Sequence, residues 1–93
     1  MKHTLIGKAS TREVWLDDER LDPRPSQMYR NHSPDGFSWG YGGSGPSQLA
    51  LAVMLELTGS PNGYQEFKWE YISKIPIDQD FEITFTDEEI KNL

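Results

Sequence analysis

Alternating apolar and polar residues mark the two ends of the chain. Residues 3–8 and 12–17 both place β-branched or aromatic residues between polar ones, and residues 9–11 separate the two runs. This spacing predicts an N-terminal β-hairpin. Residues 81–85 alternate in the same way, with an aromatic residue at each end, and predict a further strand.

Residues 46–57 have the clearest helical pattern. They contain seven consecutive apolar residues, mostly leucine and alanine, which are strong helix formers. Pro46 suits the first position of a helix, and Gly59 follows where helices typically end. Because such a run leaves no polar stripe, we expect this helix to be buried on most of its circumference and to form the centre of the core.

A capping box predicts a short C-terminal helix. In residues 86–89, the hydroxyl of Thr86 is expected to accept a hydrogen bond from the amide of Glu89, and the carboxylate of Glu89 one from the amide of Thr86. The apolar positions of the helix that follows are Ile90 and Leu93.

The aromatic segment of residues 67–74 has two interpretations. Its alternation predicts a half-buried strand, whereas Phe67 and Tyr71 at helical spacing leave a helix as the alternative. Combined with the elements above, the pattern predicts a single α+β domain over residues 1–93. Its small antiparallel sheet, of about four strands, is expected to pack around one buried central helix.

Residues 18–45 show no regular pattern and are rich in proline and glycine. Asp35-Gly36 after Pro34 predicts a turn. A long irregular loop in so short a chain is either disordered or functional. We expect this one to be pinned to the rest of the molecule by its apolar residues, Met28, Tyr29, Phe37, Trp39 and Tyr41.

Composition excludes several classes of protein. The 93 residues are too few for a multi-domain enzyme, and the absence of cysteine excludes disulfides and thiolate chemistry. The two histidines, His3 and His32, do not supply the convergent ligands of a metal site, so we expect neither a metal nor another cofactor. The chain has no secretory signal pattern and no apolar run near the about 20 residues that cross a bilayer, so we expect a cytoplasmic protein without membrane contact.

The net charge of −6 lies entirely in the second half of the chain. Residues 1–46 contain six basic and six acidic residues, whereas residues 47–93 contain three lysines and nine acidic residues. An acidic surface repels the phosphates of nucleic acids and anionic membranes, so binding in a nucleic-acid groove is not expected. The charge therefore serves solubility or docking on a basic protein partner.

The glycine-rich segment before the predicted helix carries the candidate chemistry. Gly40, Gly42 and Gly45 fit G-x-G-x-x-G, a pattern whose exposed backbone lets a phosphate approach the start of a helix. In a structural interpretation, the same glycines only let the chain turn and lie against aromatic rings. In the functional one, backbone amides, an arginine (Arg30 or Arg24) and aromatic faces form a ligand site. Its candidate residues are Arg30, His32, Trp39, Tyr41, Gly42, Gly43, Ser44, Gly45 and Ser47.

Catalysis is the weaker alternative. Ser44, His32 and Asp35 are the residue types of a hydrolytic triad, but they lie in one loop that does not fix their geometry. Pro46 replaces both the last glycine of the hydrolase pattern G-x-S-x-G and the lysine of a phosphate-binding loop. We therefore expect a binding protein rather than an enzyme.

One block of the sequence resembles a known family. It consists of RNHSPDGF at residues 30–37, WGYGGSGP at residues 39–46 and QLALA at residues 48–52. This block is similar to a family of small proteins from bacteria, phages and plasmids that is catalogued as a domain of unknown function. The resemblance implies an accessory protein of a phage or other mobile element, acting in the bacterial cytoplasm. It transfers no catalytic residue, because the family has no assigned activity.

Two functions are consistent with these features. The first is binding of a phosphate-bearing small molecule or nucleotide at the glycine-rich segment and the start of the helix. The second is interaction with a host protein, for example a defence protein that this chain would inhibit or sequester through its acidic and aromatic surface. Either function is compatible with a monomer or a homodimer.

Overall fold

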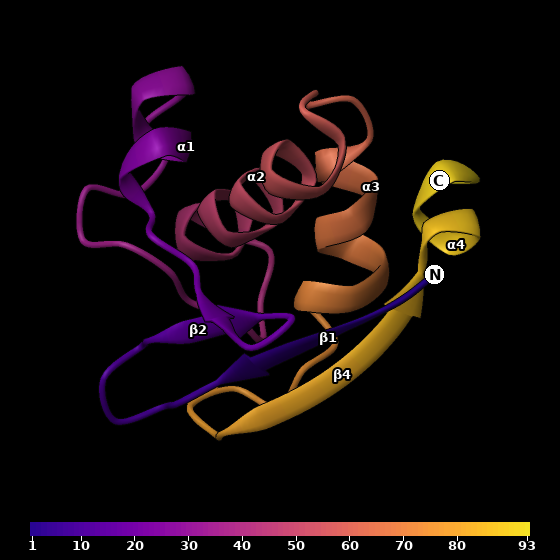
Figure 1. Cartoon of the computed structure of the whole chain (residues 1–93). Coiled ribbons are helices and arrows are strands. Elements are labelled where there is room, and N and C mark those ends of the chain that lie inside the picture. The colour runs from indigo at the N-terminus through magenta and orange to yellow at the C-terminus, as the bar shows by residue number, and fades with distance from the viewer.

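The computed structural model describes residues 1–93 and contains a four-stranded antiparallel sheet. Its strands are β1 (Lys2–Gly7), β2 (Val14–Leu16), β3 (Glu19–Arg20) and β4 (Phe81–Thr86), in the order β3-β2-β1-β4 (Figure 1). β1 pairs with both β2 and β4, so the two ends of the chain meet in the sheet. The α+β class, the hairpin and the last strand are confirmed.

A tight turn that the sequence pattern does not reveal leads from β2 into β3. Asp17 and Asp18 have φ angles of 50° and 70°. Positive φ at both central residues is typical of the two-residue type I′ turn, which matches the twist of paired strands. Trp15 of β2 pairs with Arg20 of β3. Because β3 has only two residues, no alternation could have indicated it.

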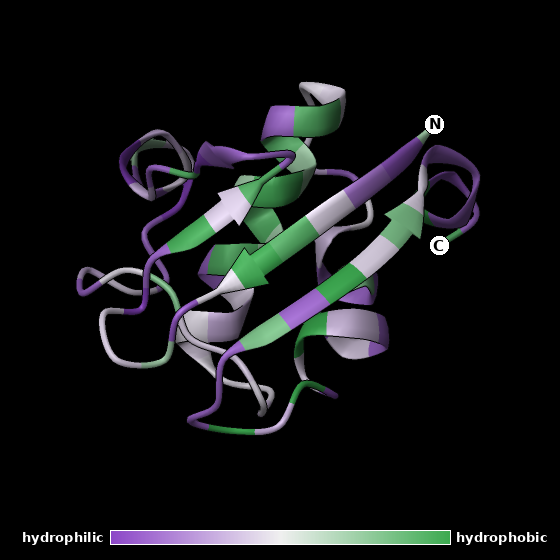
Figure 2. Ribbon diagram, turned by 60° about the horizontal axis from the view of Figure 1, so that its bottom comes forward, coloured by the Kyte–Doolittle hydropathy of each residue, from purple (hydrophilic) through white to green (hydrophobic).

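The central helix α2 (Ser44–Thr58) lies across one face of the sheet. Every residue from Gly45 to Met54 is buried, as the apolar run predicts. The helix begins two residues before Pro46, which therefore occupies the third helical position rather than the first. Gly59 ends the helix with a left-handed φ of 72°, and its amide donates to the carbonyl of Leu55. The opposite face of the sheet is not covered by helices (Figure 2).

The predicted strand over residues 67–74 is wrong, and the helical alternative is correct. The segment forms α3 (Tyr64–Phe67) and then one π-helical turn, η1 (Lys68–Ile72). The amide of Ser73 donates to the carbonyl of Lys68, five residues earlier, at 2.8 Å. Phe67 and Ile72 are both completely buried. The helical form brings these two side chains into the core, and α2 packs against α3, η1 and α1.

The long loop is more regular than its sequence indicates. It contains a short helix, α1 (Arg24–Tyr29), which packs against α2. Phe37 and Trp39 are buried and hold the segment to the core, as expected. Met28 and Tyr29, by contrast, are 88% and 58% exposed, so the prediction that they attach the loop to the core is wrong. Both lie at the end of α1, where the core no longer reaches them.

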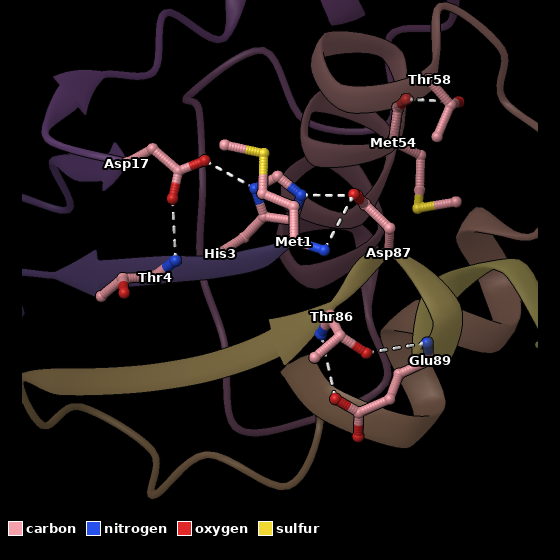
Figure 3. Close-up of polar contacts among 9 residues, drawn as sticks. All are labelled: Met1, His3, Thr4, Asp17, Met54, Thr58, Thr86, Asp87 and Glu89. Atoms are coloured by element: carbon pink, nitrogen blue, oxygen red, sulfur yellow. Dashed lines mark hydrogen bonds and ion pairs between the residues drawn. The ribbon is translucent and has the colours of Figure 1, made fainter.

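The C-terminal helix α4 (Asp87–Lys91) begins with the predicted capping box. Thr86 Oγ1 accepts from the amide of Glu89 at 3.1 Å, and Glu89 Oε1 accepts from the amide of Thr86 at 2.9 Å (Figure 3). Beside it, the buried His3 ring lies 2.6 Å from a carboxylate oxygen of Asp17 and 2.6 Å from one of Asp87. This cluster joins β1, the turn after β2 and the start of α4.

Candidate functional site

The glycine-rich segment leads from the buried Trp39 into the first turn of α2, and two aromatic rings lie against it. A Cβ atom at Gly42 would overlap the ring of Trp69, and one at Gly43 would come within 2.5 Å of the ring of Tyr41. Neither position admits a side chain unless the ring moves. Packing therefore accounts for these two glycines, as the structural interpretation of the motif requires.

Five consecutive backbone amides of this segment have no acceptor within the protein. The amide of Gly40 donates to the carbonyl of Ile72 at 3.1 Å, and the amide of Ser47 donates to that of Gly43 at 3.1 Å. Between them, the five consecutive amides of residues 41–45 make no hydrogen bond to the protein. The last two of them belong to the first turn of α2, where the helix dipole favours an anion.

Lys68 places its ammonium group beside the same segment. The residue is only 6% exposed, and its Nζ donates one hydrogen bond, 3.3 Å long, to the carbonyl of Gly42. The ammonium also lies 4.4 Å from the centroid of the Trp69 ring. Lys68 takes part in none of the ion pairs of the molecule. Its charge is therefore buried and only partly compensated.

Arg30 and His32 are two further basic residues of the candidate site. Burial lowers the pKa of His32 below its ordinary value of 6.5, and the charges of Arg30 and Lys68 lower it further. The His32 ring is therefore mostly neutral at pH 7, and its Nε2 lies 3.0 Å from the hydroxyl of Tyr64. Through Tyr64, His32 is joined to the helical segment that also carries Lys68, and Arg30 lies two residues before His32. We call Arg30, His32 and Lys68 the basic cluster.

Gln48 of α2 holds this cluster in place. Its side chain is completely buried and makes four hydrogen bonds. Oε1 accepts from the amides of His32 (2.7 Å) and Ser33 (3.0 Å), while Nε2 donates to Ser26 Oγ (2.8 Å) and the carbonyl of Arg30 (3.1 Å). The backbone of residues 30–33 is thereby fixed against the second turn of α2.

Comparison with known proteins identifies the family. The model of DUF6166, a family of unknown function, matches residues 4–93. The chain belongs to this family. No curated protein and no solved structure matches it. The DUF6166 match includes the whole candidate site, but it supplies no activity for that site.

In this DUF6166 protein, the residues predicted to bind a ligand fall into two groups. Residues 41–45 form the segment with free amides, and Arg30 and His32 are held beside α2. Trp39 and Ser47 lie in the interior instead: Trp39 is completely buried and Ser47 is 5% exposed. The aromatic face near the amides belongs to Trp69, which is 57% exposed.

Sequence reasoning missed three residues of the site. Lys68 and Trp69 come from residues 67–74, for which a strand was the leading prediction, and Tyr64 lies just before that segment. The helical alternative contained the missing signal, because residues four apart in a helix lie on one face, and this relates Tyr64 to Lys68. The carbonyl of Gly42, which accepts from Lys68, could not be linked to that residue from spacing alone.

Other kinds of site receive little support from the geometry. No hydrogen bond joins Ser44, His32 and Asp35, because the ring of His32 contacts Tyr64 instead. No three histidine or acidic side chains come together in a way that could hold a metal ion. None of the helices is long and apolar enough to cross a membrane. The main cavities, of about 300 to 460 Å³, are lined by other segments and do not involve residues 37–51.

Proposed function

We propose that this protein binds a small phosphate-bearing ligand at the N-terminus of α2. The helix has 15 residues, so its peptide dipoles add to a substantial positive potential at its start. The amides of residues 41–45 have no protein acceptor, and a phosphate can accept hydrogen bonds from several such groups at once.

The observation that carries the proposal is the buried ammonium of Lys68. A desolvated charge is costly unless it is paired, and here the protein supplies one carbonyl and one aromatic face. A phosphate would add a full negative charge and accept a short, charge-assisted hydrogen bond from Nζ. The position of this lysine, next to the residue that caps α2, supports an anion site rather than a simple packing role.

The local charge supports the same conclusion despite the acidic chain. Lys68 bonds the carbonyl of Gly42, and the backbone of Arg30 is bonded to Gln48 of α2, so two basic residues are held near the start of the helix. At physiological ionic strength, charges more than about 8 Å away are largely screened. A small anion therefore responds to this cluster more than to the net charge of −6.

The proposal is tested by titrating the protein with inorganic phosphate and following its backbone amides by NMR. The signals of residues 41–45 should shift and saturate, and the Lys68→Met variant should lose this response. Lys74→Met is the matched control, because Lys74 is 66% exposed and pairs only with Glu70. A wild-type titration without localised shifts, or one that Lys68→Met leaves intact, would contradict the proposal.

A second candidate is a docking surface for a protein partner, such as a host protein. Support for it comes from aromatic rather than acidic side chains. Tyr41, Trp69 and Ile77 are 42%, 57% and 54% exposed, and all three lie against the glycine-rich segment. Asp87 and Glu89, in contrast, are engaged within the chain by His3 and the capping box. Capture of a partner that Trp69→Ala abolishes and phosphate does not displace would favour this second function.

A further inference from the structure

The aromatic side chains beside the proposed phosphate site are placed for a second role. The edge of the Trp69 ring contacts Gly42, within the run of free amides. Trp69 is nevertheless 57% exposed, although an aromatic ring of this size is usually largely buried. One face of the ring is covered by the Lys68 ammonium, 4.4 Å from the ring centroid, and the part of the ring left exposed is the stacking surface next to the proposed phosphate position.

Tyr41 borders the site on the side of the helix. Its ring packs on Gly43, and its hydroxyl lies 3.2 Å from the position that a Cβ atom of Gly45 would occupy. Tyr41 is 42% exposed. The start of α2 is thus flanked by two partly exposed rings, each held against a glycine that has no side chain to cover it.

We infer that the ligand is a nucleoside monophosphate, whose base stacks on Trp69 while its phosphate binds Lys68 and the amides. This inference rests on the proposed function. Base–aromatic stacking tolerates any base, because every base has a π face, so the class is set by the linked ring and phosphate.

The number of phosphates follows from the charges available. Lys68 is the only buried lysine or arginine of the chain, so the site offers a ligand one buried ammonium together with the free amides. Polyphosphates are normally bound together with Mg²⁺, which is held by protein carboxylates as well as by the phosphates. A single phosphate needs no such ion, and one ammonium with several amides matches its charge.

The test compares four probes by calorimetry: inorganic phosphate, ribose 5-phosphate, adenosine monophosphate and adenosine. Stacking should make adenosine monophosphate bind about 5- to 150-fold more tightly than ribose 5-phosphate. Trp69→Ala should remove this difference, and Trp69→Phe should retain part of it. Tyr29→Ala is the control, since Tyr29 is 58% exposed on α1 and should leave all affinities unchanged.

The outcomes separate this inference from the proposed function. If adenosine monophosphate binds no more tightly than ribose 5-phosphate, or if Trp69→Ala preserves its advantage, the inference fails while phosphate binding stands. If none of the phosphates binds, both fail.

Discussion

Replacing Gln48 by methionine should destabilise the protein and loosen its candidate site. Methionine has a similar length but none of the donors and acceptors that make the four hydrogen bonds of Gln48. A typical hydrogen bond contributes about 1 kcal/mol net, and a buried group left unsatisfied costs about 1–3 kcal/mol. The variant leaves the amides of His32 and Ser33 without their acceptor.

Some of this loss is recovered. The amide of His32 also donates to the carbonyl of Arg30 at 3.2 Å, and this bond remains in the variant. Ser26 Oγ likewise still donates to the carbonyl of Pro23 at 2.7 Å. Because His32 and Ser33 are only partly buried, water can also reach their amides. We therefore expect a loss of about 2–4 kcal/mol in the free energy of unfolding. That is a large part of the about 5–15 kcal/mol typical of a native protein.

Urea and thermal unfolding measure this effect directly. A loss of about 3 kcal/mol should lower the Tm by about 10–25 °C in a chain of this size. Gln48→Glu keeps the acceptor oxygens but buries a charge, so it should also destabilise at pH 7 and recover partly when acid protonates the new carboxyl. Gln79→Met, at an exposed position whose side chain makes no hydrogen bond, is the control. If Gln48→Met unfolds within error of this control, the account of Gln48 is wrong.

Three further predictions concern charged groups. Burial disfavours the charged form of His3, but its bonds to Asp17 and Asp87 outweigh this and raise its pKa above 6.5, while His3 lowers the pKa of both carboxyls below 3.8. Stability measured by urea unfolding should therefore be highest between about pH 4 and 6.5, falling on both sides, and His3→Gln should flatten both slopes. Acidification through the lowered pKa of His32, which lies below 6.5, should tighten the binding of sulfate, an anion that keeps its charge as the pH falls from 7 toward that pKa and below it. Lys68→Met should leave the free energy of unfolding unchanged or higher, because removing a buried, incompletely paired charge is often neutral or stabilising.

The elements that sequence alone predicts are those fixed by neighbouring residues. The capping box needs only Thr86 and Glu89, and both of its hydrogen bonds are present. The apolar run of α2 is sufficient to place the helix at the centre of the core. In residues 67–74, the alternation of aromatic and polar residues was misleading. The buried residues Phe67 and Ile72 are five positions apart, and this spacing places two residues on one face in neither a strand nor an α-helix. The π-helical turn that reconciles them is chosen by packing against α2, which local pattern does not contain.

The candidate site was predictable only where it is local. The pattern G-x-G-x-x-G locates the glycines, the start of α2 and the free amides, because these features adjoin one another in sequence. Lys68 lies 26 residues from Gly42, and nothing in the sequence relates the two before the helical segment is placed. Nothing in the sequence relates Trp69 to Gly42 either. The sequence pattern pointed to Trp39 as the aromatic residue of the site, but Trp39 is buried and Trp69 is exposed there instead.

The glycines of the motif cannot by themselves distinguish a ligand site from a packing device. Trp69 and Tyr41 would exclude side chains at Gly42 and Gly43 in either case, so substitutions there would damage both. Lys68 separates the alternatives, because the two make opposite predictions for the same variant. A lysine kept for its cation–π contact and its bond to Gly42 should cost stability when it becomes methionine. A lysine kept for an anion should lose binding while the fold keeps its stability. The sign of that change therefore decides what the segment before α2 is for.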